Sequence, residues 1–185
     1  METLNDQERI AVARLHALLE LLPTALDRQL TPAGLTSFEY TLIEALSEAD
    51  AGRLRMSALA SRTNATLPRL SRVVSSLERK GLVVRAACEE DGRATNAILT
   101  DDGRRAHADA RPSYENAVRS MILDGLDDED VDRLADLTLS ILTRLDPDRR
   151  LAITAEGADA ACAADPPVAA APVADCPADP PGVAA

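Results

Sequence analysis

The chain contains few of the residues that several common classes of protein depend on. Its 185 residues include three cysteines and two histidines, and aromatic residues make up 2% of the composition. Three cysteines without a CxxC pair exclude a disulfide scaffold and disfavour a zinc site. The sequence also has no nucleophile motif and no glycine-rich phosphate loop, so we expect neither an enzyme nor a bound cofactor. With so few aromatic side chains, the core must be built from Leu, Val, Ile and Ala, which suits packed helices.

Long hydrophobic runs are missing as well. No stretch approaches the about 18 uncharged apolar residues of a membrane span. The N-terminal residues METLNDQERIAVARLH do not place an apolar stretch after a basic one, as a secretory signal does. We therefore expect a cytoplasmic protein that does not contact the membrane.

Positive charge is scarce overall, but it is concentrated in one region. The net charge is −11, yet residues 53–105 carry 11 basic and 6 acidic residues. Residues 1–52 and 106–146 each have a net charge of −6. Between Arg55 and Arg85, seven basic residues stand against one acidic residue. A phosphate backbone responds to this local density rather than to the total, so the middle of the chain is expected to contact nucleic acid.

Hydrophobic periodicity and turn residues divide the chain into helices and one hairpin. The hairpin, LVVRAACEEDGRATNAILT, turns at Asp91-Gly92. The predicted helices are 7–29, 36–49, 57–63, 66–80, 101–124 and 127–146. This order predicts a mainly α fold, in which a winged helix-turn-helix with a small β-hairpin wing lies between terminal helices.

Local signals mark the ends of these helices and possible breaks in them. Thr36 and Glu39 form the S/T-x-x-E pattern of a capping box, and Thr66 is the expected N-cap of the fourth helix. Pro23 is expected to bend or split the first helix, and Pro112 to interrupt the fifth.

The composition changes at Pro147. Seven of the eleven prolines lie from this position onward, mixed with Ala and Asp. Such a segment buries too little apolar surface to offset the entropy of ordering. We therefore expect a folded domain over residues 1–146 and a disordered Ala/Pro/Asp-rich tail over 147–185.

The helix predicted at 66–80 has two different faces. The apolar face would pack on helices 36–49 and 57–63, and it consists of Leu67, Leu70, Val73, Val74 and Leu77. The remaining surface presents hydroxyl and guanidinium groups, from Arg69, Arg72, Ser75, Ser76 and Arg79. A recognition helix in a DNA groove needs this division. The alternative is an ordinary solvated face with surplus arginine.

The predicted hairpin places Arg93 near its tip, with Asp91 able to hold the guanidinium. An arginine at the end of a thin hairpin suits the narrow minor groove, where the negative potential is strongest. The alternative is a salt bridge within a surface turn.

Three stretches together resemble the winged helix-turn-helix core of MarR-type transcriptional regulators, over residues 35–105. They are LTSFEYTLIEAL, MSALASRTNATLPRLSRVVSSLERKGLVVR and EEDGRATNAILTDDGR. Ser71 and Arg72 match the family's Thr/Ser-Arg pair, and Asp91 and Arg93 match its D-x-R wing. Thr66-Leu67-Pro68 departs from the family's more usual Ser-Pro-Ser. The DNA contacts predicted on this basis are Thr66, Pro68, Arg69, Ser71, Arg72, Ser75, Arg79, Asp91 and Arg93.

The resemblance also implies an assembly. A homodimer would place its recognition helices in successive major grooves of double-stranded DNA, at a pseudo-palindromic operator, most often as a repressor. Helices 7–29, 101–124 and 127–146 would form the dimer. The apolar stripes of the first and last helix favour this independently, because a symmetry mate would bury them. The alternative is packing within one chain.

Regulators of this kind often bind small aromatic or phenolic effectors between the dimer helices and the DNA-binding lobe. Candidate residues here are His16, Phe38, Tyr40 and His107, although a single such residue on a helix is more often part of the core or the surface. Carboxylates next to Cys88 disfavour the thiolate form, which favours an inert cysteine over a redox sensor. The alternative for the whole chain is a winged-helix protein-interaction module that no longer binds DNA.

Overall fold

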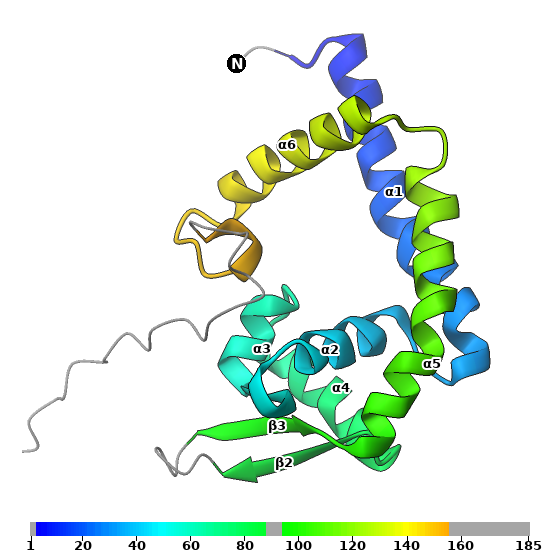
Figure 1. Ribbon diagram of the computed structural model, residues 1–185. Helices are drawn as coiled ribbons and strands as arrows, with labels where there is room; N and C mark the ends of the chain where they lie inside the picture. Colours follow the sequence, from blue (N-terminus) through cyan, green and yellow to red (C-terminus); the bar gives the residue numbers. More distant parts are fainter. Residues whose placement is uncertain (1–2, 88–93, 156–185) are drawn as a thin grey trace, which may run out of the picture.

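The computed structural model describes residues 3–87 and 94–155, and its elements follow the predicted order (Figure 1). The helices are α1 (Asp6–Leu30), α2 (Ser37–Ser47), α3 (Met56–Arg62), α4 (Leu67–Arg79), α5 (Asp101–Val118) and α6 (Asp128–Leu145). The strands are β1 (Arg53–Arg55), β2 (Val83–Ala87) and β3 (Thr95–Leu99). Short 3-10 turns occupy Thr31–Ala33, Asp50–Gly52 and Ala152–Thr154, and a π-helical turn, Arg119–Leu123, extends α5. The predicted fold class, mainly α with a winged helix-turn-helix, is confirmed.

The strands form a small antiparallel sheet next to the helix-turn-helix. Their order is β1-β3-β2, so β3 lies in the middle. In the β2–β3 hairpin Val83 pairs with Leu99 and Arg85 with Ala97. The short strand β1 joins the other edge of β3.

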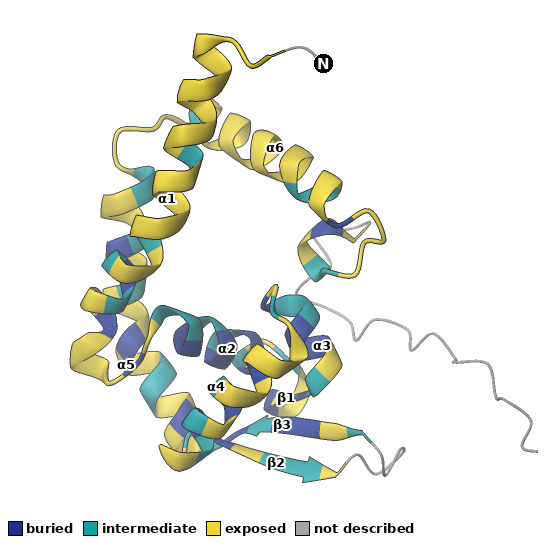
Figure 2. Ribbon diagram, turned by 180° about the vertical axis from the view of Figure 1, so that it is seen from behind, coloured by how far each residue is buried: buried dark blue, intermediate teal, exposed yellow. Residues whose placement is uncertain are grey.

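The core lies where α2, α3 and α4 meet each other and the sheet (Figure 2). Among the described residues, its largest fully buried aliphatic side chains are Leu30, Leu42, Ile43, Leu46, Leu59, Leu70, Val74, Leu77 and Val83. Tyr40 is also fully buried. The core is therefore largely aliphatic, as the composition predicted.

The capping box at the start of α2 is present. The Thr36 hydroxyl accepts from the Glu39 backbone N–H at 3.2 Å, and the Thr36 N–H donates to the Glu39 carboxylate at 2.9 Å. Thr66 does occupy the N-cap position of α4, but its side chain makes no capping hydrogen bond. One reason is Pro68 at the second helical position, which removes one of the two N–H groups that a cap can bind.

Pro23 does not split the first helix, and the predicted interruption at Pro112 is wrong. Pro23 lies inside α1 and Pro112 inside α5, and each helix continues past its proline. A proline removes one backbone hydrogen bond. Both helices extend for several turns before the proline, and the bonds of those turns persist.

The predicted tail does not begin at Pro147 as a disordered segment. The Asp146 carboxylate accepts from the backbone N–H groups of Arg150 at 3.0 Å and Leu151 at 2.9 Å, and from the Thr154 hydroxyl. The Ser61 hydroxyl of α3 donates to the Arg150 carbonyl at 2.7 Å. Residues 147–155 therefore fold back on α3, and the rest of the predicted tail, 156–185, lies outside the described residues.

The remaining helices extend away from the core. α1 and α5 pack side by side, whereas α6 turns back toward α3 and buries none of its residues (Figures 1 and 2). Within the described ranges, each helix is too short or too polar to cross a lipid bilayer.

Candidate nucleic-acid interface

Helix α4 has an inner and an outer face, largely as predicted. Leu70, Val74 and Leu77 are fully buried and Val73 is half-buried. Six of the predicted DNA contacts are exposed on the outer face: Pro68, Arg69, Ser71, Arg72, Ser75 and Arg79. The seventh, Thr66, is exposed at the N-cap. The structure therefore brings these seven residues to one helix surface. Ser76, also predicted on that face, is instead half-buried and donates to Glu39.

Leu67 is an exception to the predicted division. It was expected on the apolar face, but it is 52% exposed. It is the first residue of α4, and the buried face begins only one turn later at Leu70. The first turn of the helix thus carries an uncovered apolar side chain.

A cation–π contact holds one of the outer arginines. The Arg69 guanidinium lies over the Phe38 ring, 4.1 Å from its centroid. Phe38 belongs to α2 and is partly buried against the core. This contact holds the Arg69 guanidinium on the side of α4 that faces α2.

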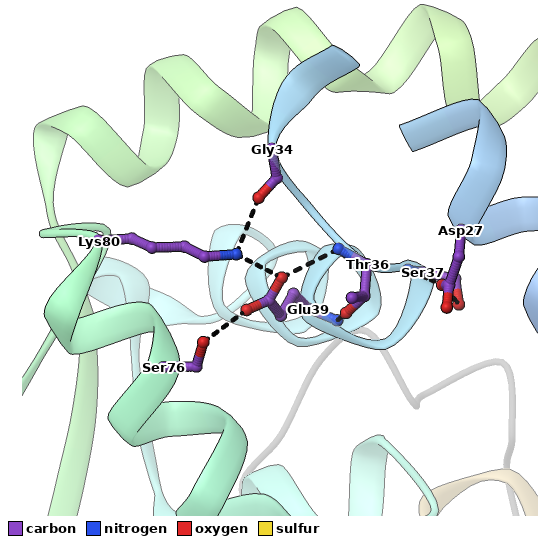
Figure 3. Close-up of polar contacts among 7 residues, drawn as sticks. All are labelled: Asp27, Gly34, Thr36, Ser37, Glu39, Ser76 and Lys80. Atoms are coloured by element: carbon purple, nitrogen blue, oxygen red, sulfur yellow. Dashed lines mark hydrogen bonds and ion pairs between the residues drawn. The ribbon is translucent and has the colours of Figure 1, made fainter. Parts of the chain in front are cut away.

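A buried carboxylate joins α4 to the start of α2 (Figure 3). Glu39 is 4% exposed and accepts from Ser76 Oγ at 3.0 Å and Lys80 Nζ at 2.7 Å, in addition to its capping bond with Thr36. Lys80 also donates to the Gly34 carbonyl at 2.8 Å. Burial alone would raise the pKa of Glu39, but the hydrogen bonds from Lys80, Thr36 and Ser76 outweigh it and lower that pKa. Glu39 is therefore ionised and holds the C-terminal half of α4 against α2.

Arg85 of β2 holds the opposite side of α4. Its guanidinium donates to the Ser71 carbonyl at 2.8 Å, to Ser75 Oγ at 3.1 Å and to the Glu78 carboxylate. Arg85 was not among the predicted DNA contacts, although it is the last residue of the stretch MSALASRTNATLPRLSRVVSSLERKGLVVR. Its partners come from another element, so no local pattern points to them.

The predicted wing contacts Asp91 and Arg93 lie outside the described residues. Strands β2 and β3, which lead to them, extend from the side of α4 (Figure 1). The hairpin that would carry a wing is therefore present up to Ala87 and from Ala94.

Two of the effector candidates meet in an aromatic stack between α2 and α5. The Tyr40 ring lies 4.2 Å from that of Tyr114 and 5.4 Å from that of His107, centroid to centroid. Burial raises the pKa of Tyr40, whose hydroxyl donates to Glu44 at 3.1 Å, and burial lowers the pKa of His107. Phe38 lies instead against Arg69, and His16 is exposed on α1.

Known proteins share this sequence pattern and this fold. The MarR family model matches residues 29–94. The chain is similar to Sco3205, a MarR family transcriptional regulator from Streptomyces coelicolor whose crystal structure is in complex with DNA. The identity is 34% and the TM-score 0.76, over 78% of this chain and 91% of that chain.

Two further structures extend the comparison. AbsC, a MarR family transcriptional regulator from Streptomyces coelicolor, has 33% identity and a TM-score of 0.74, over 78% of this chain and 98% of its own. CouR from Rhodococcus jostii RHA1, bound to p-coumaroyl-CoA, has 25% identity and a TM-score of 0.61, over 76% of this chain and 95% of its own.

Proposed function

Because the chain belongs to the MarR family of transcriptional regulators, we propose that it is a homodimeric repressor that binds a pseudo-palindromic operator in double-stranded DNA. The observation that carries this proposal is the division of α4. The side chains of its inner face are buried in the core, while three arginines and two serines lie exposed on its outer face. A helix in the major groove needs such a surface, and Sco3205, its relative, was crystallised with DNA.

The proposed roles follow from position and chemistry. Arg72 and Ser75 lie near the middle of the outer face of α4 and would reach base edges, since Arg binds guanine bidentately and Ser donates to either bases or phosphates. Arg69 and Arg79 flank them and would contact phosphates. Thr66, Pro68 and Ser71 complete the proposed major-groove surface, and Asp91 and Arg93 would form the wing in the minor groove.

Exposed apolar residues on the terminal helices support the dimer. On α1 they are Ile10, Val12, Leu18, Leu19 and Leu21, and on α6 they are Val131, Leu134, Leu137, Leu139, Ile141 and Leu145. So many exposed apolar side chains on two helices indicate an interface, because leaving them in water is costly. We propose that a second copy covers them, which would place two DNA-binding lobes side by side.

The effector proposed for this chain is a small aromatic or phenolic compound. CouR, which is 25% identical, was crystallised with p-coumaroyl-CoA, and on this basis we propose that this chain binds a small aromatic compound. The Tyr40–Tyr114–His107 stack would sense it most directly, since it joins α5 to the DNA-binding lobe. We place the protein in the cytoplasm, where its DNA is.

DNA binding by single-residue variants tests the proposal. Fluorescence anisotropy would measure Kd on an operator taken from the protein's own promoter region and on a scrambled duplex. We expect Arg72→Ala to raise Kd on the operator roughly tenfold or more and to relax base preference. Arg93→Ala should weaken binding to both duplexes similarly and reduce the salt dependence by about one counterion.

Arg150→Ala serves as the matched control, because this arginine is exposed after the end of α6, where it pairs with Asp148 at 2.8 Å. Its Kd should equal that of the wild type. Equal Kd values for wild type, Arg72→Ala and Arg93→Ala would refute the proposed roles and favour a winged-helix protein-interaction module. Sedimentation velocity of the wild type should show a dimer, and a monomer would refute the assembly.

A further inference from the structure

The first two residues of α4, Leu67 and Pro68, are exposed and have no hydrogen-bonding side chain. Leu67 is 52% exposed, and Pro68 beside it is exposed and has no N–H group. The rest of the outer face is cationic or carries hydroxyl groups. The beginning of this helix therefore presents an apolar tip on an otherwise polar surface.

The elements that pack on α4 leave this tip uncovered. Arg85 of β2 reaches the helix at Ser71, Ser75 and Glu78, one turn and more beyond Leu67. On the other side, the Phe38 ring lies against Arg69. Since side chains of a helix tilt toward its N-terminus, Leu67 extends past the first turn rather than back onto the core.

The position of this tip determines what it can meet. In a helix-turn-helix the N-terminal residues of the recognition helix contact base edges in the major groove. The only apolar group that an unmodified base presents there is the C5-methyl of thymine. Neither Leu67 nor Pro68 has a side-chain donor or acceptor for the hydrogen-bonding groups of the other bases.

We propose that Leu67, supported by Pro68, is a specificity-determining residue that contacts a thymine methyl group in each half of the operator. This inference rests on the proposed function, because it requires α4 to enter the major groove. It adds a statement about sequence: each half-site carries a thymine where the start of α4 meets the bases. Arg72 and Ser75 would read the neighbouring positions by hydrogen bonds.

Removing single methyl groups from the DNA tests the contact. An operator would first be selected from random duplexes with the full-length protein, and each thymine would then be replaced in turn by deoxyuridine. We expect one thymine per half-site at which the replacement raises Kd about fourfold, the value for exposing one methyl group, and about fifteenfold when both halves are changed.

Variants of the protein assign that effect to Leu67. In Leu67→Ala the same deoxyuridine replacement should leave Kd unchanged, whereas Leu67→Met, which keeps an apolar side chain of similar volume, should retain the sensitivity. Leu4→Ala is the matched control, because Leu4 is 58% exposed and precedes α1, whose first turns lie far from α4 in Figure 1. It should show the wild-type dependence on the methyl group.

Two results would overturn this inference but leave the proposed function standing. One is a tightly bound operator in which no deoxyuridine replacement raises Kd, and the other is an undiminished methyl effect in Leu67→Ala. If selection instead enriches no sequence at all, the proposed function fails and the inference fails with it. The two failures are therefore distinguishable by whether the wild-type protein has an operator.

Discussion

Replacing Glu39 by Gln tests how α4 is held in place. Gln has nearly the same volume, so it leaves no cavity, and at the third helical position it can still serve the capping box with Thr36. The amide oxygen can take the place of Oε2, which accepts from Thr36 and Lys80, but the amide NH2 then replaces Oε1, which accepts from Ser76. The substitution therefore removes the acceptor for the Ser76 hydroxyl and the negative charge that pairs with Lys80.

The expected loss of stability follows from the contacts with Ser76 and Lys80. The hydrogen bond from the Ser76 hydroxyl to the ionised carboxylate contributes about 1.5 kcal/mol, and because the Gln amide can donate to that hydroxyl in return, about 1 kcal/mol is lost. A charge-assisted bond would contribute about 2 kcal/mol, but the Lys80 side chain is 36% exposed, and solvent screening reduces its share to about 1 kcal/mol. Glu39→Gln should therefore lower the free energy of unfolding by about 2 kcal/mol at pH 7.

The pH dependence of stability distinguishes the loss of the Glu39 charge from any change in side-chain packing. The pKa of Glu39 is lowered in the folded protein, because its hydrogen bonds outweigh the effect of burial. A lowered folded pKa contributes stability that is fully present above the unfolded value of about 4.3 and is lost as pH falls through the folded pKa. The advantage of the wild type over Glu39→Gln should therefore shrink below about pH 4.

Urea unfolding at a fixed protomer concentration would measure this difference at pH 7 and near pH 3. Glu115→Gln is the control, since Glu115 forms an exposed pair with Arg111, and its loss should change stability by less than about 0.5 kcal/mol. A Glu39→Gln protein as stable as the wild type at pH 7 would refute the reasoning, as would an equal deficit at both pH values.

Three further substitutions test single contacts. Phe38→Leu should raise the operator Kd about threefold, because Arg69 loses its cation–π partner, and Phe38→Trp should restore the wild-type Kd. Fluorescence anisotropy measures both Kd values, and an unchanged Kd in Phe38→Leu would contradict the reasoning. Gly103→Ala should lower stability by more than about 3 kcal/mol, since its Cβ would lie 2.2 Å from the Leu82 carbonyl oxygen; a normal urea midpoint would exclude the clash. Arg85→Met should lower stability by about 2 kcal/mol and weaken operator binding, because three α4 residues lose its hydrogen bonds; wild-type values in both assays would argue against a positioning role.

The fold could be predicted because its signals are local. The order of helices follows from apolar spacing, and the start of α2 follows from Thr36 and Glu39 three residues apart. The buried residues Leu70, Val74 and Leu77 share one face of α4 for the same reason. These patterns need no knowledge of what the helix packs against.

The contacts that hold the candidate site were not predictable in this way. Arg69 meets Phe38, which lies 31 positions earlier in the chain, and Glu39 meets Lys80 across 41 positions. No spacing in the sequence specifies such pairs. The exposure of Leu67 was missed for a related reason, since a helical pattern gives the direction of a side chain but not whether a neighbour covers it.

The distribution of charge explains how a chain with a net charge of −11 can bind a polyanion. Asp127, Asp128, Glu129 and Asp130 lie at the beginning of α6, where they favour the positive end of the helix dipole. That helix has 18 residues, so it extends for about 27 Å, whereas charges in physiological salt are screened over about 8 Å. Its acidic end lies away from α4 in Figure 1, so these carboxylates repel a duplex bound at α4 only weakly. The salt dependence of binding should therefore report the arginines around α4 rather than the net charge of the chain.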